Sequence, residues 1–208
     1  YKRQGQMLVL YLLCTKLSYE QKSINKKDYQ KKIKSLMSLS KYAKNTLNIE
    51  DKIQTLGKDF ANSKGSMFLG RGYSYPIALE GALKLKELAY VHAEGYPAGE
   101  MKHGPLALIE EGMPVVVIAP RDEHYKKTIS NMQEVISRGA KVLLITNKST
   151  DEIYSENIWE QIEVDAISDE LIPFLTTIPL QKLAYYSALD KGYDIDKPRN
   201  LAKSVTVE

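Results

Sequence analysis

Few residues in this sequence belong to the types that form disulfides or bind metals. The chain has one cysteine in 208 residues, Cys14, which excludes an internal disulfide and is typical of a reducing, cytoplasmic compartment. Because Cys14 lies in an apolar helical stretch, we expect it to be a buried small hydrophobic residue and not a nucleophile. His92, His103 and His124 lack the spacing of metal ligands, so no metal site is predicted.

Long hydrophobic runs and a strong charge imbalance are also absent. The apolar run at 7–14 is too short to span a bilayer and has no small-residue cleavage site, so neither a membrane segment nor a signal peptide is predicted. The net charge of +3 is too small to indicate a nucleic-acid ligand. We therefore interpret the many lysines of segment 26–47 as the solvated face of a helix.

The first 64 residues predict helices and no strands. We expect helices at 4–17, 26–47 and 48–64, with the third interrupted or capped near Gly57. Segment 4–17 is apolar on most sides, which predicts that it is buried against another element. We interpret 1–64 as a helical linker without a core of its own.

From residue 65 to residue 193 the pattern changes to alternating strands and helices. Strands are expected at 67–70, 91–94, 114–120, 141–146 and 159–164, and helices at 76–90, 103–109, 125–137 and 169–191, with a turn at 95–99. The continuous apolar runs are typical of parallel strands that are covered on both faces. The segment therefore predicts a three-layer α/β domain with a five-stranded parallel sheet in flavodoxin-like order. Segment 194–208 is polar and aperiodic, which predicts a disordered tail.

The expected helix at 76–90 carries three charged residues at positions i, i+4 and i+7. Glu80, Lys84 and Glu87 would lie on one side of it and could supply a base, a cation and an orienting carboxylate. Spacing alone favours ordinary surface ion pairs. The preceding strand and glycine-rich turn place the helix at a strand end, where α/β proteins bind ligands. Because Tyr75 replaces the third glycine of a dinucleotide motif, no nucleotide or other cofactor is expected.

Two stretches resemble a known family. GRGYSYPIALEGALKLKELAYVHAEGYPAGEMKHGPLALIEEGMPV at 70–115 and DKPRNLAKSVTVE at 196–208 closely resemble the isomerase part of the glutamine–fructose-6-phosphate aminotransferase (isomerising) family. The resemblance covers essentially the whole chain. It implies that 65–193 is the second sugar-isomerase (SIS) subdomain, that 194–208 is a catalytic tail, and that 1–64 is the connector with the end of the first subdomain.

The resemblance also implies roles for individual residues. Lys203 matches the lysine that forms a Schiff base with the open-chain sugar, which requires a neutral amine. Glu87 matches the carboxylate that moves a proton between C2 and C1 of fructose 6-phosphate on the way to glucosamine 6-phosphate. Lys84 matches the cation that stabilises the developing negative charge, and Glu80 matches a carboxylate that positions substrate or lysine.

The remaining matched residues concern the partner subunit and the tail. His103 matches a histidine that assists opening of the sugar ring and is presented across a dimer interface, which implies a homodimer with a shared site. Arg199 and Asn200 match residues that hold the tail in place.

The sequence also lacks parts of the family's enzyme. The glutaminase domain is absent, as are the Ser/Thr-rich loops of the first SIS subdomain that bind the sugar phosphate, so we expect a fragment that binds fructose 6-phosphate weakly or not at all. Two other interpretations stay open. One is a non-catalytic SIS module that binds a phosphosugar effector. The other is a structural dimerisation module, in which a partner covers the apolar segment 7–17.

Overall fold

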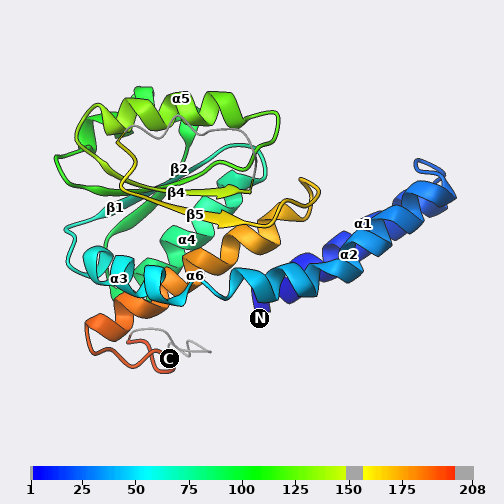
Figure 1. Ribbon diagram of the computed structural model, residues 1–208, viewed down its shortest axis with the longest axis horizontal. Helices are drawn as coiled ribbons and strands as arrows, with labels where there is room; N and C mark the ends of the chain where they lie inside the picture. The colour runs from blue at the N-terminus through cyan, green and yellow to red at the C-terminus, as the bar shows by residue number, and fades with distance from the viewer. Residues whose placement is uncertain (1, 149–156, 200–208) are drawn as a thin grey trace, which may run out of the picture.

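The computed structural model describes residues 2–148 and 157–199 as a three-layer α/β domain with a two-helix arm (Figure 1). The sheet consists of β1 (Ser66–Gly70), β2 (Ala93–Pro97), β3 (Pro114–Ile118), β4 (Lys141–Asn147) and β5 (Glu160–Val164). All four neighbouring pairs are parallel, and the strand order is β2-β1-β3-β4-β5. This order is flavodoxin-like, so the predicted architecture is confirmed.

Helices cover both faces of the sheet (Figure 1). One face carries α3 (Glu50–Ala61), α4 (Ser74–Ala89) and α6 (Ile172–Asp190), and the other carries α5 (Tyr125–Ile136) and the 3₁₀ segments η1 (Ala98–His103) and η2 (Pro105–Leu108). Strand side chains alternate between the faces, so each buried strand supplies both layers. Phe68 and Val116 belong to the core under α4 and α6, whereas Leu69 and Val117 belong to the core under α5.

The arm is an antiparallel pair made of α1 (Lys2–Glu20) and α2 (Lys26–Thr46), which projects away from the sheet (Figure 1). The prediction that the apolar first helix is buried is wrong for the described chain. Val9 and Leu10 are 63% and 59% exposed. Cys14 is also exposed, against the prediction, and Thr15 is the buried side chain of α1. The physical reason is that α1 leaves the body of the domain, so α2 covers one side of it and the opposite side stays open.

Two glycines that the sequence predicts to be breaks lie inside regular elements. Helix α3 runs through Gly57 without interruption. A Cβ at this position would lie 2.6 Å from the Tyr186 Cβ of α6, so the packing of α6 explains the glycine. Strand β2 continues to Pro97 through the predicted turn, and a Cβ on Gly95 would lie 2.9 Å from the Leu79 backbone. In both places glycine permits the close approach of a helix.

Other boundaries differ by a few residues. In place of the helix expected at 103–109, η1 and η2 flank Gly104, whose φ of +136° stops a continuous helix. Of the tail predicted to be disordered, the structure describes the part up to Arg199, and 200–208 lie outside the described residues. Within the described ranges, no helix is long and apolar enough to cross a bilayer.

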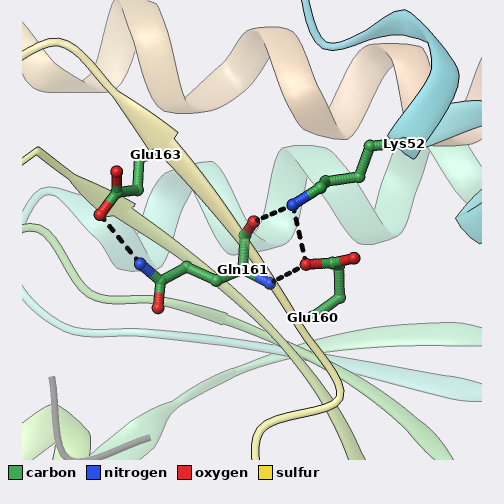
Figure 2. A network of polar contacts seen from close by, with 4 residues as sticks. All are labelled: Lys52, Glu160, Gln161 and Glu163. Carbon is green, nitrogen blue, oxygen red and sulfur yellow. Dashed lines mark hydrogen bonds and ion pairs between the residues drawn. The ribbon is translucent and has the colours of Figure 1, made fainter.

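The edge strand β5 is fastened to α3 by a polar network (Figure 2). The Lys52 ammonium lies 2.9 Å from a Glu160 carboxylate oxygen and donates to the Gln161 carbonyl at 3.1 Å. The Gln161 side chain in turn donates to Glu163 at 2.9 Å. Charged side chains of this kind discourage pairing with another strand, which protects the edge of the sheet.

Candidate functional site

The candidate site is built on α4, and the turn before α4 fixes where that helix starts. Gly70 ends β1, and a Cβ on it would lie 2.3 Å from the Ser74 carbonyl oxygen. Gly72 has a φ of +52°, a conformation that glycine adopts without strain. These two glycines let α4 begin directly at the carboxyl end of a central strand, which is where ligands bind in open α/β sheets.

Glu80 is a buried carboxylate, with 7% of the side chain exposed. One oxygen, Oε2, forms an ion pair with the Arg3 guanidinium of α1 at 3.0 Å. The other oxygen, Oε1, is buried and has no hydrogen-bond partner among the described residues. Burying a charged oxygen without a partner is costly, and such groups in native proteins often have a functional role.

Lys84 and Glu87 form the second charged pair of the helix. The Lys84 ammonium lies 2.5 Å from a Glu87 carboxylate oxygen, and both side chains are 27% exposed. Lys84 also faces a pocket of about 400 Å³ that it shares with Glu80. The pocket is lined by Lys2, Arg3, Gln6, Glu80, Lys84 and Gln181. Its volume lies at the lower end of the range for small-molecule sites.

The structure therefore brings Glu80 and Lys84 to one pocket, while Glu87 contacts Lys84 and is not among the lining residues. Sequence reasoning missed Arg3 and Gln181, which come from α1 and α6. Their spacing carried no signal, because they reach the pocket through the packing of distant helices. A polar residue within an apolar helix, as Gln181 is in α6, was the available hint.

His103 lies apart from this pocket. It ends η1, whose residues Ala98 and Met101 belong to the core under α5, on the opposite face of the sheet from α4. Its side chain is 76% exposed and lies 3.8 Å from the Glu100 carboxylate. Within one chain, the structure does not bring His103 together with Glu80 and Lys84.

The described part of the tail reaches the end of α4. The backbone N–H of Arg199 donates to the Tyr90 hydroxyl at 2.6 Å, and the Arg199 guanidinium lies 4.0 Å from the centre of the Tyr90 ring. Asn200 and Lys203 lie outside the described residues. In the described part of the chain, no group of three or more His, Cys, Asp or Glu side chains could hold a metal ion.

These features define a doubly wound α/β protein with a polar pocket beside the first helix after β1. The family model described as "SIS domain" matches residues 59–190, and the chain belongs to this family. The glutamine–fructose-6-phosphate aminotransferase (isomerizing) of Bacteroides thetaiotaomicron is 49% identical over 204 residues, which are 98% of this chain and 33% of the relative. The enzyme of the same name from Bartonella quintana is 44% identical over 203 residues, with the same coverage.

A solved structure gives the same result. The C-terminal domain of glucosamine-fructose-6-phosphate aminotransferase from Francisella tularensis is 42% identical and superposes with a TM-score of 0.81. The match covers 85% of this chain and 49% of that chain. The resemblance inferred from the sequence is confirmed. The chain spans about a third of the length of the curated relatives it matches.

Proposed function

We propose that this chain is the C-terminal isomerase segment of a glutamine–fructose-6-phosphate aminotransferase (isomerising). The observation that carries the proposal is the match to enzymes of this one name along 98% of the chain. We divide the chain into the connector at 1–64, the second SIS subdomain at 65–193 and a catalytic tail at 194–208. The substrate is fructose 6-phosphate, and the nitrogen of the product, glucosamine 6-phosphate, comes from glutamine.

The chemistry we propose uses the tail and α4 together. The neutral Lys203 amine adds to the C2 carbonyl of the open-chain ketose, and loss of water gives a protonated Schiff base that withdraws electrons from C1. Ammonia released from glutamine then adds to C2 and displaces the Lys203 amine, which leaves an imine that carries the new nitrogen. A carboxylate removes a proton from C1 of this imine and returns a proton to C2, which converts the ketose skeleton to an aldose with an amine at C2. Glu87 suits this role, because its carboxylate is partly exposed and oriented by Lys84 at 2.5 Å.

Lys84 and Glu80 have supporting roles in this proposal. The Lys84 ammonium faces the pocket and stabilises the negative charge that develops as the C1 proton is removed. Glu80 is fixed by Arg3, and its free oxygen accepts a hydrogen bond from the substrate or from the Lys203 amine. Arg199 and Asn200 hold the tail. A fixed carboxylate is suited to positioning because its orientation costs little on binding.

We propose that His103 assists ring opening in the site of a second copy of the chain. Two facts support a homodimer with shared sites. His103 is 76% exposed, and the sheet separates its segment from the pocket of its own chain. An imidazole in that place is exposed enough to enter another subunit's pocket, where it would act as a general acid or base.

Borohydride trapping with fructose 6-phosphate tests the proposal. The protein is a chimaera in which this chain replaces the matching segment of the Bacteroides thetaiotaomicron enzyme, with the isolated chain measured alongside. We expect a reduced hexose-phosphate adduct on Lys203 in the chimaera and little or none on the isolated chain. Lys203→Arg should abolish it, whereas Lys197→Arg, a matched change in the same tail, should not.

The same experiment separates the alternative of a non-catalytic effector module. Such a module would bind the sugar phosphate without forming an adduct, and Lys203→Arg would leave its binding unchanged. A folded chimaera that binds fructose 6-phosphate but gives no adduct on Lys203 would overturn the enzymatic proposal.

A further inference from the structure

Tyr90 follows the last residue of α4 and makes three contacts with the chain that follows α6. Its hydroxyl accepts a hydrogen bond from the Arg199 backbone at 2.6 Å. The face of its ring lies 4.0 Å from the Arg199 guanidinium, a distance typical of a strong cation–π contact. Its ring also lies 4.8 Å from the ring of Tyr193. One side chain thus holds both ends of segment 193–199.

The segment between these contacts contains a turn that brings the chain back to Tyr90. The Asp194 carboxylate accepts from the backbone N–H groups of Asp196 and Lys197 at 2.9 and 3.2 Å, which makes a turn just after α6. Lys191 donates from its side chain to the Ala89 carbonyl at 3.1 Å, so α6 is also tied to the end of α4. The chain leaves α6 and bends back beneath the helical layer (Figure 1).

The backbone of Tyr90 has an unusual conformation for a tyrosine. Its φ is +54° and its ψ is +33°, in the left-handed region, where helices commonly end with glycine. A tyrosine in this conformation is strained, whereas a glycine would not be. The contacts to Arg199 and Tyr193 are what the side chain provides in exchange, which indicates a role for the ring and hydroxyl beyond ending the helix.

Chain geometry connects this contact to the pocket. Along α4, Tyr90 lies about 4.5 Å beyond Glu87 and about 9 Å beyond Lys84, at 1.5 Å per residue. Lys203 lies four positions after Arg199 in the sequence, and four residues span at most about 14 Å. The chain length after Arg199 therefore permits a lysine at position 203 to reach the turns of α4 that carry Glu87 and Lys84.

We propose that Tyr90 is a positioning residue that docks the tail through Arg199 and thereby delivers Lys203 to the α4 site. This inference rests on the proposed function, because it presupposes that Lys203 is the Schiff-base lysine. Tyr90 itself does not touch the reacting atoms in this scheme. It raises the local concentration of the lysine and restricts its direction of approach.

The test uses Tyr90→Asn and Tyr90→Phe in the chimaera. Asparagine tolerates the left-handed conformation, so the end of α4 should keep its stability while the ring contacts are lost. We expect the rate of borohydride-trapped adduct on Lys203 to fall at least tenfold in Tyr90→Asn and less in Tyr90→Phe, which keeps the ring. The melting temperature and the affinity for fructose 6-phosphate should not change. Tyr185→Phe, at an exposed tyrosine of α6, is the matched control.

Each outcome decides one of the two proposals. No adduct on Lys203 with Tyr90 intact overturns the proposed function. An adduct with Tyr90 intact that forms equally fast in Tyr90→Asn overturns the positioning role and leaves the proposed function standing. Combining Tyr90→Asn with Arg199→Ala gives a second check. If the two side chains act through one contact, the double variant should be no slower than Tyr90→Asn alone.

Discussion

The ion pair between Arg3 and Glu80 should stabilise the protein well beyond an ordinary surface pair. Arg3→Met removes the guanidinium and keeps most of the side-chain volume, leaving a carboxylate that is 7% exposed with neither oxygen paired among the described residues. Removing one partner of a fully buried ion pair costs about 3–5 kcal/mol, and the half-exposed Arg3 places this pair below that range. We therefore expect a loss of about 2 kcal/mol, or about 4–8 °C in melting temperature.

The assay is thermal unfolding of three variants and a control. Glu80→Gln removes the buried charge, so it should cost less than about 1 kcal/mol. Adding Glu80→Gln to Arg3→Met should recover at least half of the loss, because the orphaned charge is then gone. Lys16→Met breaks an exposed pair with Glu20 on the same helix and should leave the melting temperature almost unchanged. The reasoning about Glu80 is refuted if Arg3→Met has the same melting temperature as Lys16→Met. It is also refuted if the double variant is no more stable than Arg3→Met.

Three other variants test packing, pH dependence and chemistry. Gly57→Ala places a methyl group 2.6 Å from the Tyr186 Cβ and should cost about 1–3 kcal/mol in denaturant unfolding. The hydrogen bond from the Tyr186 hydroxyl to Glu50 raises the pKa of Tyr186 to about 12 and lowers the pKa of Glu50. The contribution of this bond to folding stability should therefore be complete between pH 4.5 and pH 10.0, the ordinary pKa values of the two groups, and decline outside that range. Unfolding of the parent protein and of Tyr186→Phe across pH would measure this contribution. A stability difference that does not change with pH would contradict the expectation. Glu87→Gln in the chimaera should lower kcat by about 10²–10⁴ with an unchanged melting temperature, and near-normal kcat would remove Glu87 from the proton transfer.

The sheet could be predicted from the sequence because its strands carry their own signal. Strands β1, β3 and β4 are short apolar runs bounded by glycine, proline or charge, and burial on both faces requires that composition. Strand β2 was missed in its second half because Gly95 and Pro97 have the composition of a turn. Its glycine is instead required by the approach of α4, a tertiary contact that no local pattern carries.

For the candidate site, too, some features could be predicted from the sequence and others depend on tertiary contacts. The spacing of Glu80, Lys84 and Glu87 on one side of a helix follows from helical periodicity and could be predicted. The burial of Glu80 depends on Arg3, which is 77 positions earlier in the chain and was not predicted. The exposure of Cys14 could not be predicted either, because it depends on how α1 leaves the domain.

Exposure along α4 changes in a way that fits the proposed division of roles. Glu80 is 7% exposed and held by Arg3, whereas Lys84 and Glu87 are 27% exposed and contact each other. Arg3 of α1 reaches Glu80 in the middle of α4, whereas Lys84 and Glu87 lie on its later turns. A positioning carboxylate benefits from being fixed, whereas a carboxylate that exchanges protons with a sugar must be accessible to it. Tyr90, which directly follows α4, contacts Arg199 of the tail. In the proposed scheme, this helix and the residue after it therefore supply the pocket, the proton-transfer pair and the docking point for the tail.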